Sequence, residues 1–405
     1  MKQKIIDKIN RLASQKEPFL FVINYQADEA FIRKLSDINP EECLFDFEGR
    51  GNWRENHSKE MGDSKRIYEE ISREIPKEIS EKKFFKGTPL DSPISWQITP
   101  PLYNDYERSF NIVKSNIMAG NSYLTNLTNR VPVSCNLSLE EIFHRAKGKY
   151  KLLLRRKRTQ AEDKAHLKEE NIEENLTPFV CFSPETFVRI KGGRIYSYPM
   201  KGTLDASLPN AEKLLMEDRK EAAEHATIVD LIRNDLSRVA EDVRVDKYRY
   251  IDVLHTNKGD ILQTSSEISG RLPEDYRQHL GEILDAQLPA GSITGAPKDK
   301  TMQIIHEAEG YDRGFYTGIM GIYDHGELNS AVMIRFIEEE TSPVDFETDG
   351  EKNFKASEGK GDEASEGKRD EASRKLYFKA GGGITSKSDC RKEYEEVIQK
   401  IYLPF

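Results

Sequence analysis

Short turns between strand-like segments constrain the fold of this 405-residue chain more than any other feature. Residues 187–198 alternate apolar and polar side chains around Gly192-Gly193, a pattern typical of a β-hairpin. A second short turn, Asp324-His325-Gly326, separates Tyr323 from Leu328. Turns this short join antiparallel strands, because parallel neighbours need a crossover of a dozen or more residues. The sequence therefore predicts an α+β fold with largely antiparallel sheets.

The other patterned segments mix strands with helices. Apolar runs predict strands at residues 19–23, 122–128, 318–323 and 331–337. Longer amphipathic segments predict helices at residues 210–240 and 389–402. Two further stretches, 155–178 and 338–375, are so highly charged that they cannot bury enough apolar surface to offset their ordering entropy. We expect these two stretches to be flexible insertions in sheet loops, without a chemical role.

Charge and cysteine usage narrow the function classes. The chain has 61 basic and 70 acidic residues, for a net charge of -9, which argues against a general nucleic-acid surface. Its four cysteines lie far apart, without metal-ligand spacing, and fit reduced thiols. Residues 1–15 lack the continuous apolar stretch of a secretion signal or membrane span. We expect a cytoplasmic protein that acts on a small molecule, with no membrane or nucleic-acid partner.

A lysine at the end of the predicted hairpin is the first candidate for catalysis. It lies in Pro199-Met200-Lys201-Gly202-Thr203, directly after the strand that ends near Tyr198. A lysine acts as a nucleophile only if its pKa falls from about 10.4 toward neutrality, which requires burial or a nearby cation. The alternative is a surface lysine beside a turn, and the motif alone leaves both interpretations open.

Two acidic pairs are candidates for metal binding. Glu221 and Glu224 are three residues apart on the first predicted helix, and Glu393 and Glu396 are three apart on the last. Residues at this spacing share a helix face. Two such pairs could meet around Mg²⁺, which takes a few carboxylates and completes its coordination with water and substrate oxygens. Solvated helix faces explain the same pattern equally simply.

Three features could bind an anion. The small-residue segment 288–298, which includes Ser292 and Thr294, precedes a predicted helix at 301–309, whose N-terminus favours negative charge. The glycines of 380–384 could offer backbone N–H groups to an anion, or they could form a flexible turn. Arg335 lies within an apolar run, so its guanidinium needs a carboxylate partner from the protein or from a ligand.

Together and in this order, these motifs resemble the chorismate-utilising enzymes, a family that includes anthranilate synthase component I, aminodeoxychorismate synthase component I, isochorismate synthase and salicylate synthase. The matching blocks are residues 120–128, 183–185, 199–203, 223–235, 291–298, Arg335, 381–383 and 393–396. The resemblance implies large, mostly antiparallel sheets packed as a sandwich with helices outside. It also implies a catalytic domain over 104–405, with residues 1–103 contributing to the same sandwich.

The resemblance further implies a reaction. Lysine in the motif around Lys201 is typical of the aminodeoxychorismate synthase branch, whereas anthranilate synthases carry alanine there. Water-adding members of the family use a lysine at the position of Leu124, and leucine cannot activate water. The implied reaction converts chorismate and ammonia to 4-amino-4-deoxychorismate, the precursor of 4-aminobenzoate for folate. Lys201 would attack ring C2 while Glu185 protonates the leaving C4 hydroxyl.

The remaining site residues follow from the same resemblance. Glu224 and Glu396 would hold Mg²⁺, with Glu221 and Glu393 acting through its waters. The substrate would be seated by Gly202, Thr203, Ser292, Thr294, Tyr316, Arg335, Gly382 and Gly383. No turn typical of an amidotransferase nucleophile is found, so a separate glutamine amidotransferase subunit would deliver the ammonia.

Two positions depart from the family pattern, and two alternatives stay open. Leu124 stands where the branch usually carries glutamine, and Gln263 stands where anthranilate synthases carry histidine. That histidine is associated with the loss of pyruvate, so its absence fits a product that keeps its enolpyruvyl group. The alternatives are anthranilate synthase component I and a non-catalytic chorismate-binding regulatory protein.

Overall fold

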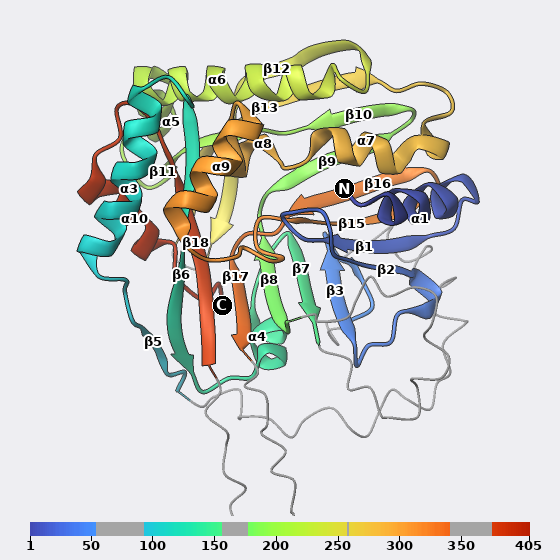
Figure 1. The fold of residues 1–405 in the computed structure, drawn as a ribbon, viewed down its shortest axis with the longest axis horizontal. Coiled ribbons are helices and arrows are strands. Elements are labelled where there is room, and N and C mark those ends of the chain that lie inside the picture. Colours follow the sequence, from blue (N-terminus) through green and yellow to red (C-terminus); the bar gives the residue numbers. More distant parts are fainter. Residues whose placement is uncertain (54–92, 156–176, 257–258, 341–374) are drawn as a thin grey trace, which may run out of the picture.

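Two large antiparallel sheets form the centre of the molecule. The computed structural model describes residues 1–53, 93–155, 177–256, 259–340 and 375–405 (Figure 1). Sheet A has the strand order β11 (Met200–Asp205), β13 (Gly259–Arg271), β10 (Arg194–Ser197), β9 (Thr186–Lys191), β16 (Glu327–Val332), β15 (Ile319–Asp324), β1 (Phe19–Ile23) and β2 (Ala30–Lys34), with β12 (Glu241–Thr256) also pairing with β13. Sheet B has the order β14 (Gly295–Ala296), β6 (Leu124–Cys135), β18 (Lys375–Ile384), β17 (Phe336–Glu340), β8 (Phe179–Ser183), β7 (Tyr150–Leu154), β3 (Cys43–Phe47) and β4 (Arg50–Gly51), with β5 (Trp96–Ile98) pairing with β6.

Apolar side chains between the sheets hold them face to face. In β1, Leu20 and Val22 point into a buried cluster shared with Phe45, Leu152 and Phe179 of sheet B. The alternate residues of β1 pack on the other side of sheet A. Successive side chains of a strand point to opposite faces, so a strand buried on both sides must be apolar throughout. This explains why β1 was recognisable as a continuous apolar run.

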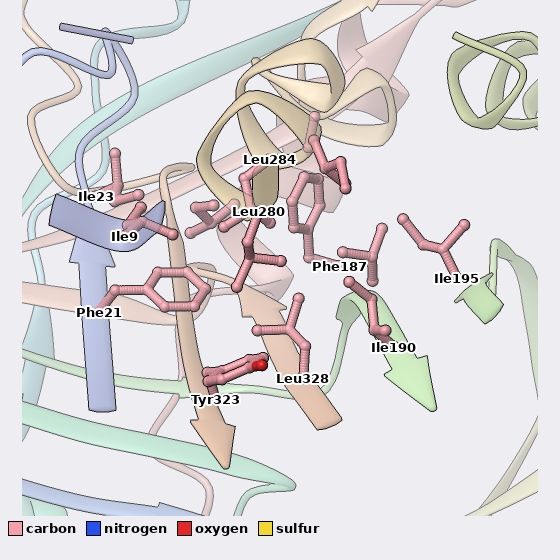
Figure 2. Close-up of a cluster of buried hydrophobic side chains, with 14 of the residues drawn as sticks. Ile9, Phe21, Ile23, Phe187, Ile190, Ile195, Leu280, Leu284, Tyr323 and Leu328 are labelled. Carbon is pink, nitrogen blue, oxygen red and sulfur yellow. The ribbon is translucent and has the colours of Figure 1, made fainter. Parts of the chain in front are cut away.

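Helices cover the two outer faces. Sheet A is covered by α1 (Gln3–Ser14), α6 (Arg219–Leu236), α7 (Leu280–Gln287) and α8 (Gly291–Thr294). Figure 2 shows this outer core, where Ile9, Leu280 and Leu284 approach Phe21, Phe187 and Leu328 of the sheet. Sheet B is covered by α3 (Tyr103–Met118), α4 (Leu139–Arg145), α9 (Lys298–Glu309) and α10 (Cys390–Gln399). The predicted sandwich with helices outside is confirmed.

Smaller elements complete the described chain. Helix α5 (Ala211–Glu217) packs Leu215 on Leu204 and Leu262 at the β11 end of sheet A, and two short 3-10 helices lie at Leu35–Asp37 and Tyr276–His279. Residues 1–103 supply β1 and β2 to sheet A and β3, β4 and β5 to sheet B. Within the described ranges, no helix is both long and apolar enough to cross a membrane.

Two predicted elements are divided in the structure. The helix predicted over 210–240 breaks at Asp218, whose extended backbone (ψ 111°) separates α5 from α6. The strand predicted over 331–337 is also wrong, because β16 ends at Val332 in sheet A and β17 begins at Phe336 in sheet B. Apolarity is continuous there because the chain stays buried while it crosses from one sheet to the other.

The predicted insertions are shorter than expected where the structure describes their ends. Glu338 belongs to β17, and its carboxylate pairs with Lys379 at 2.7 Å and with Arg130 at 2.6 Å. Arg155 pairs with Glu140 at 2.8 Å. These charged residues are ordered because each has an opposite charge beside it. Most of both insertions, residues 156–176 and 341–374, lies outside the described residues.

Candidate active site

Two crossings between the sheets place the proposed acid beside the proposed anion-binding arginine. Glu185 lies between β8 of sheet B and β9 of sheet A, and Arg335 lies between β16 of sheet A and β17 of sheet B. The crossings are joined by backbone hydrogen bonds, from Val332 N–H to the Glu185 carbonyl and from Phe182 N–H to the Arg335 carbonyl, both 3.2 Å. Arg335 has a left-handed backbone (φ 55°), an uncommon conformation for a non-glycine residue.

The Glu185 carboxylate is held in a defined environment. Ser292, on the short helix α8, donates a hydrogen bond of 2.6 Å from Oγ to Glu185 Oε1. Burial raises the pKa of Glu185, while the Ser292 hydrogen bond and the charges of Lys201, Arg335 and Lys400 oppose that shift. A raised pKa is what a carboxyl group needs if it is to donate a proton near neutral pH.

Lys201 projects from an irregular point in β11. Its partner on β13 is Thr264, and the pairing register shifts between Lys201 and Thr203, where Gly202 adopts φ 73°. The Lys201 Nζ lies 3.7 Å from the point that a Cβ on Gly383 would occupy, and Leu124 Cδ1 lies 3.1 Å from the same point. Among the described residues, this amine has no hydrogen bond or ion pair. The lysine of sheet A therefore meets an apolar wall made by β6 and β18 of sheet B.

Glutamates from both acidic pairs, Glu221, Glu393 and Glu396, lie beside glycines of the two sheets. A Cβ on Gly202 would lie 3.2 Å from Glu221 Oε2, and a Cβ on Gly382 would lie 3.6 Å from Glu393 Oε2 and 4.0 Å from Glu396 Oε1. A side chain at Gly382 would therefore contact two carboxylates. No group of three or more acidic, histidine or cysteine side chains is close enough to hold a metal, among the residues that the structure describes.

Lys400 is a charged residue that the sequence analysis missed. Its Nζ pairs with Glu396 at 2.7 Å, donates to the Gly381 carbonyl at 2.9 Å and lies 3.7 Å from the Cβ position of Gly382. It is four residues after Glu396, and this spacing of opposite charges on a helix is a recognisable signal. Lys400 adds a cation to the space between α10 and β18.

His225 is a second residue that was missed. It is fully buried on α6, and its Nε2 lies 2.6 Å from Ser266 Oγ on β13. Burial, together with the charges of Arg249 and Lys201, lowers the pKa of His225 to about 4. The imidazole is therefore neutral near pH 7. The sequence did not reveal this histidine, because a histidine next to Glu224 in a predicted helix gives no distinct signal that it is buried and neutral.

Several predicted binding residues occupy other positions than expected. Thr203 is exposed opposite Gln263 on β13. Thr294 is fully buried, and its hydroxyl lies beside that of Tyr25. The glycines of 381–383 do not form a turn, because they lie within β18 and pair with β6. Their role is to leave space beside the strand, since their backbone groups belong to the sheet ladder.

Aromatic rings close the site around Arg335. Tyr316 is buried and packs on Phe336, and the positive charge of Arg335 partly offsets the burial that raises the pKa of this tyrosine. The Arg335 guanidinium also lies 5.5 Å from the ring centroid of Tyr402. The site thus combines a carboxylic acid, an amine, two further cations and two pairs of carboxylates. Such a set can bind an anionic substrate, donate a proton and form a covalent bond.

Comparison with known proteins identifies close and distant relatives. Residues 1–347 match the family described as chorismate binding enzyme. The chain is 40% identical to an uncharacterized PabA-like protein of Haemophilus influenzae, over 99% of this chain and 97% of that protein. The crystal structure of a putative 2,3-dihydroxybenzoate-specific isochorismate synthase from Bacillus anthracis superposes with a TM-score of 0.61 at 16% identity, covering 98% of this chain and 86% of the other.

More distant relatives carry two different activities in their names. Anthranilate synthase component 1 of Aquifex aeolicus is 33% identical over 54% of this chain and 38% of its own length. Aminodeoxychorismate synthase component 1 of Salmonella typhimurium is 31% identical over 56% of this chain and 46% of its own length. Because the two identities are so similar, overall similarity does not distinguish the products, and the distinction depends on individual site residues.

Proposed function

The chain belongs to the chorismate-binding enzyme family, and from this membership we propose that it converts chorismate and ammonia to 4-amino-4-deoxychorismate. The observation that carries the proposal is the amine of Lys201, which lies against Leu124 and Gly383 and is electrostatically coupled to Glu185. An amine and a raised-pKa carboxyl group in one site supply the nucleophile and the acid of a double displacement.

The proposed reaction has two displacements. In the first, Lys201 Nζ bonds to ring C2, both ring double bonds shift by one position, and the C4 hydroxyl leaves as water after it accepts the Glu185 proton. In the second, ammonia bonds to C4, the two double bonds shift back, the electron pair of the Lys201–C2 bond returns to the amine, and the new C4 ammonium gives a proton to the Glu185 carboxylate. The net change is chorismate plus ammonia to 4-amino-4-deoxychorismate plus water, and the enolpyruvyl group is retained.

The carboxylate groups of the substrate need positive charge in the site. Besides Lys201, Arg335 and Lys400 are the cations whose charges act on Glu185, Lys400 lies beside Gly382, and Tyr316 lies within the influence of Arg335. Ser292 would orient the acid, and Gly202, Gly382 and Gly383 would leave room for the ring. We place the substrate between these groups. Thr203 is exposed and Thr294 is fully buried, so both are weaker candidates for direct contact with the substrate.

Mg²⁺ is the cofactor that we propose for the acidic pairs. Carboxylate oxygens are the ligands that this ion prefers, and those of Glu393 and Glu396 lie beside Gly382, which has no side chain to exclude an ion. Glu224 and Glu396 would be its ligands, with Glu221 and Glu393 holding its waters. When bound, Mg²⁺ would neutralise a substrate carboxylate that these glutamates otherwise repel.

We further propose that ammonia is delivered by a glutamine amidotransferase on a separate chain, since no amidotransferase nucleophile turn is found in this sequence. Anthranilate synthesis is the second candidate function, and the similarity to the Aquifex aeolicus enzyme favours it. It requires ammonia to attack C2 itself. Lys201 argues against that reaction, because its amine would compete for the same carbon.

Product identity tests the proposal. The purified chain is incubated with chorismate, Mg²⁺ and ammonium at mildly alkaline pH, and the products are identified by mass spectrometry. A product that retains the enolpyruvyl group, and that an added lyase converts to 4-aminobenzoate, supports the proposal. Formation of anthranilate and pyruvate would overturn it in favour of the second candidate.

A further inference from the structure

A buried ion pair between Lys298 and Asp235, near the segment that carries Ser292, has no role in the function described so far. Lys298 Nζ lies 2.9 Å from Asp235 Oδ2, and the two side chains are only 11% and 9% exposed. Lys298 is the first residue of α9, and Asp235 lies near the end of α6. Two charges this deeply buried require desolvation of both groups, so the pair itself is not evidence of added stability.

The ion pair, together with Gln287, joins the two ends of the segment that carries Ser292. Lys298 Nζ also donates to the Gln287 carbonyl at 2.9 Å, and Gln287 Nε2 donates to the Asp235 carbonyl at 2.9 Å. Gln287 is the last residue of α7 and Lys298 is the first of α9. The ten residues between them, 288–297, therefore form a loop whose two ends are joined to each other and to α6.

Within this loop, α8 lies close against the same aspartate. A Cβ on Gly291 would be 2.9 Å from Leu231 Cδ2 and 3.3 Å from Asp235 Oδ2, so a side chain here would press against Leu231 and Asp235. A small cavity of about 30 Å³ is lined by Glu185, Ser292, Asp235 and Gln287, among others. The carboxylate of Asp235 and that of Glu185 thus border one space, with α8 between their supporting elements.

We propose that Lys298 and Asp235 are positioning residues, which fix the loop 288–297 so that the Ser292 hydroxyl stays hydrogen-bonded to Glu185. The role of Glu185 as the acid rests on the proposed function. The effect of Lys298 and Asp235 on the hydrogen bond between Ser292 and Glu185 does not. A hydrogen bond of 2.6 Å depends on where α8 sits, and α8 is too short to fix its own position.

The molecule contains a matched control for this proposal. Lys379 on β18 lies 2.7 Å from Glu338 and donates to the carbonyls of Arg313 at 2.9 Å and Asp312 at 3.5 Å, a similar combination of one carboxylate with backbone carbonyls. Its side chain is 2% exposed, but neither Lys379 nor Glu338 lines the cavity beside Glu185. Lys379→Met therefore removes a buried lysine whose hydrogen bonds and ion pair involve no residue of the loop 288–297.

The test compares Lys298→Met, Ser292→Ala, their double variant and Lys379→Met. The pKa of Glu185 is measured by isotope-edited infrared spectroscopy, with Glu185→Gln identifying the band, and kcat and KM are measured where turnover is found. We expect Lys298→Met and Ser292→Ala each to raise the pKa of Glu185, because the hydrogen bond that favours its ionised form is lost. We expect kcat to fall about 10- to 100-fold with little change in KM.

The double variant separates positioning from a general loss of stability. If Lys298 acts through Ser292, adding Lys298→Met to Ser292→Ala causes no further rise in the pKa of Glu185, and Lys379→Met causes none at all. If Lys298→Met proves too unstable to purify, Asp235→Asn/Lys298→Met leaves no buried charge unpaired and is expected to show the same rise.

An unchanged Glu185 pKa in Lys298→Met or in the Asp235→Asn/Lys298→Met variant would overturn the proposal, provided that Ser292→Ala shifts it. An equal shift in Lys379→Met would also overturn it. Since the infrared measurement needs no turnover, these results are distinct from a failure of the proposed reaction, which the product analysis reveals in the wild-type protein.

Discussion

The acid end and the nucleophile end of the site are built differently. Glu185 is fixed by the sheet crossing, by the Ser292 hydroxyl and by surrounding cations. Lys201 lies at a bulge, beside Leu124 and Gly383, and its amine has no hydrogen bond or ion pair with any described residue. The protein itself therefore positions the carboxyl group of Glu185, the proposed acid, whereas the amine of Lys201 stays available to a substrate.

This difference has a chemical reason. A general acid works only if its pKa and its direction are set before the substrate binds. A lysine nucleophile needs a lone pair, and a strong acceptor or a carboxylate partner would favour its protonated form. Among the described residues, the acidic pairs on α6 and α10 are not gathered into a metal-binding group, and Glu396 pairs with Lys400.

The largest effect is expected from removing the nucleophile. Lys201→Ala should lower the formation of 4-amino-4-deoxychorismate by at least about 10³-fold, since the covalent route is lost. Residual turnover should shift toward amination at C2, because ammonia no longer competes with an amine there. Mass spectrometry of the products measures both effects. An unchanged rate and product would remove Lys201 from the mechanism.

Replacing the acid should have the next largest effect. Glu185→Gln keeps the shape of the side chain and its capacity to accept from Ser292, but it cannot supply the proton. We expect kcat to fall about 10²- to 10⁴-fold, with a smaller change in KM. Steady-state kinetics at several pH values measure this loss. A variant with nearly wild-type kcat would show that the hydroxyl leaves without help from Glu185.

The metal assignment predicts a change in Mg²⁺ dependence. Glu396→Gln should raise the Mg²⁺ concentration needed for half-maximal activity about tenfold or more, since even indirect metal partners have effects of this size. It also breaks the ion pair with Lys400, so Lys400→Met is the matched control for that loss. Wild-type Mg²⁺ titration in Glu396→Gln would exclude this residue as a ligand.

The smallest expected effect is a shift of the pH profile. In the proposed reaction Glu185 acts in its protonated form, so activity should fall as pH rises through its raised pKa. Ser292 stabilises the ionised form, and Ser292→Ala should therefore move this basic limb to higher pH. Profiles of kcat against pH for the two proteins provide the comparison. A limb that moves to lower pH would contradict the assigned sign.

Local patterns predicted the antiparallel strands, and the resemblance to the family supplied the sandwich and most of the candidate site residues. Alternation and short turns identified the hairpin before Lys201, and β1 was predicted with its correct bounds. The crossings at Glu185 and Arg335 could not be found in this way. Buried residues continue through the change of sheet, so the apolar run 331–337 resembles one strand.

Local sequence patterns also did not predict contacts between segments that lie far apart in the sequence. Lys400 approaches Gly382 only because α10 packs on β18, and Leu124 reaches Gly383 only because β6 and β18 pair. The sequence therefore identified Leu124 as a departure without showing what it touches. In the structure its methyl group and the Lys201 amine both lie next to Gly383.

The most direct test of the account is peptide mass spectrometry of the protein after incubation with chorismate and Mg²⁺ in the absence of ammonia. The account predicts that the Lys201 peptide gains the mass of chorismate minus water, that Lys201→Ala does not, and that added ammonium removes the modification as product forms. The same mass gain in Lys201→Ala, or an unmodified wild-type protein that still forms product when ammonium is added, would contradict the covalent role of Lys201.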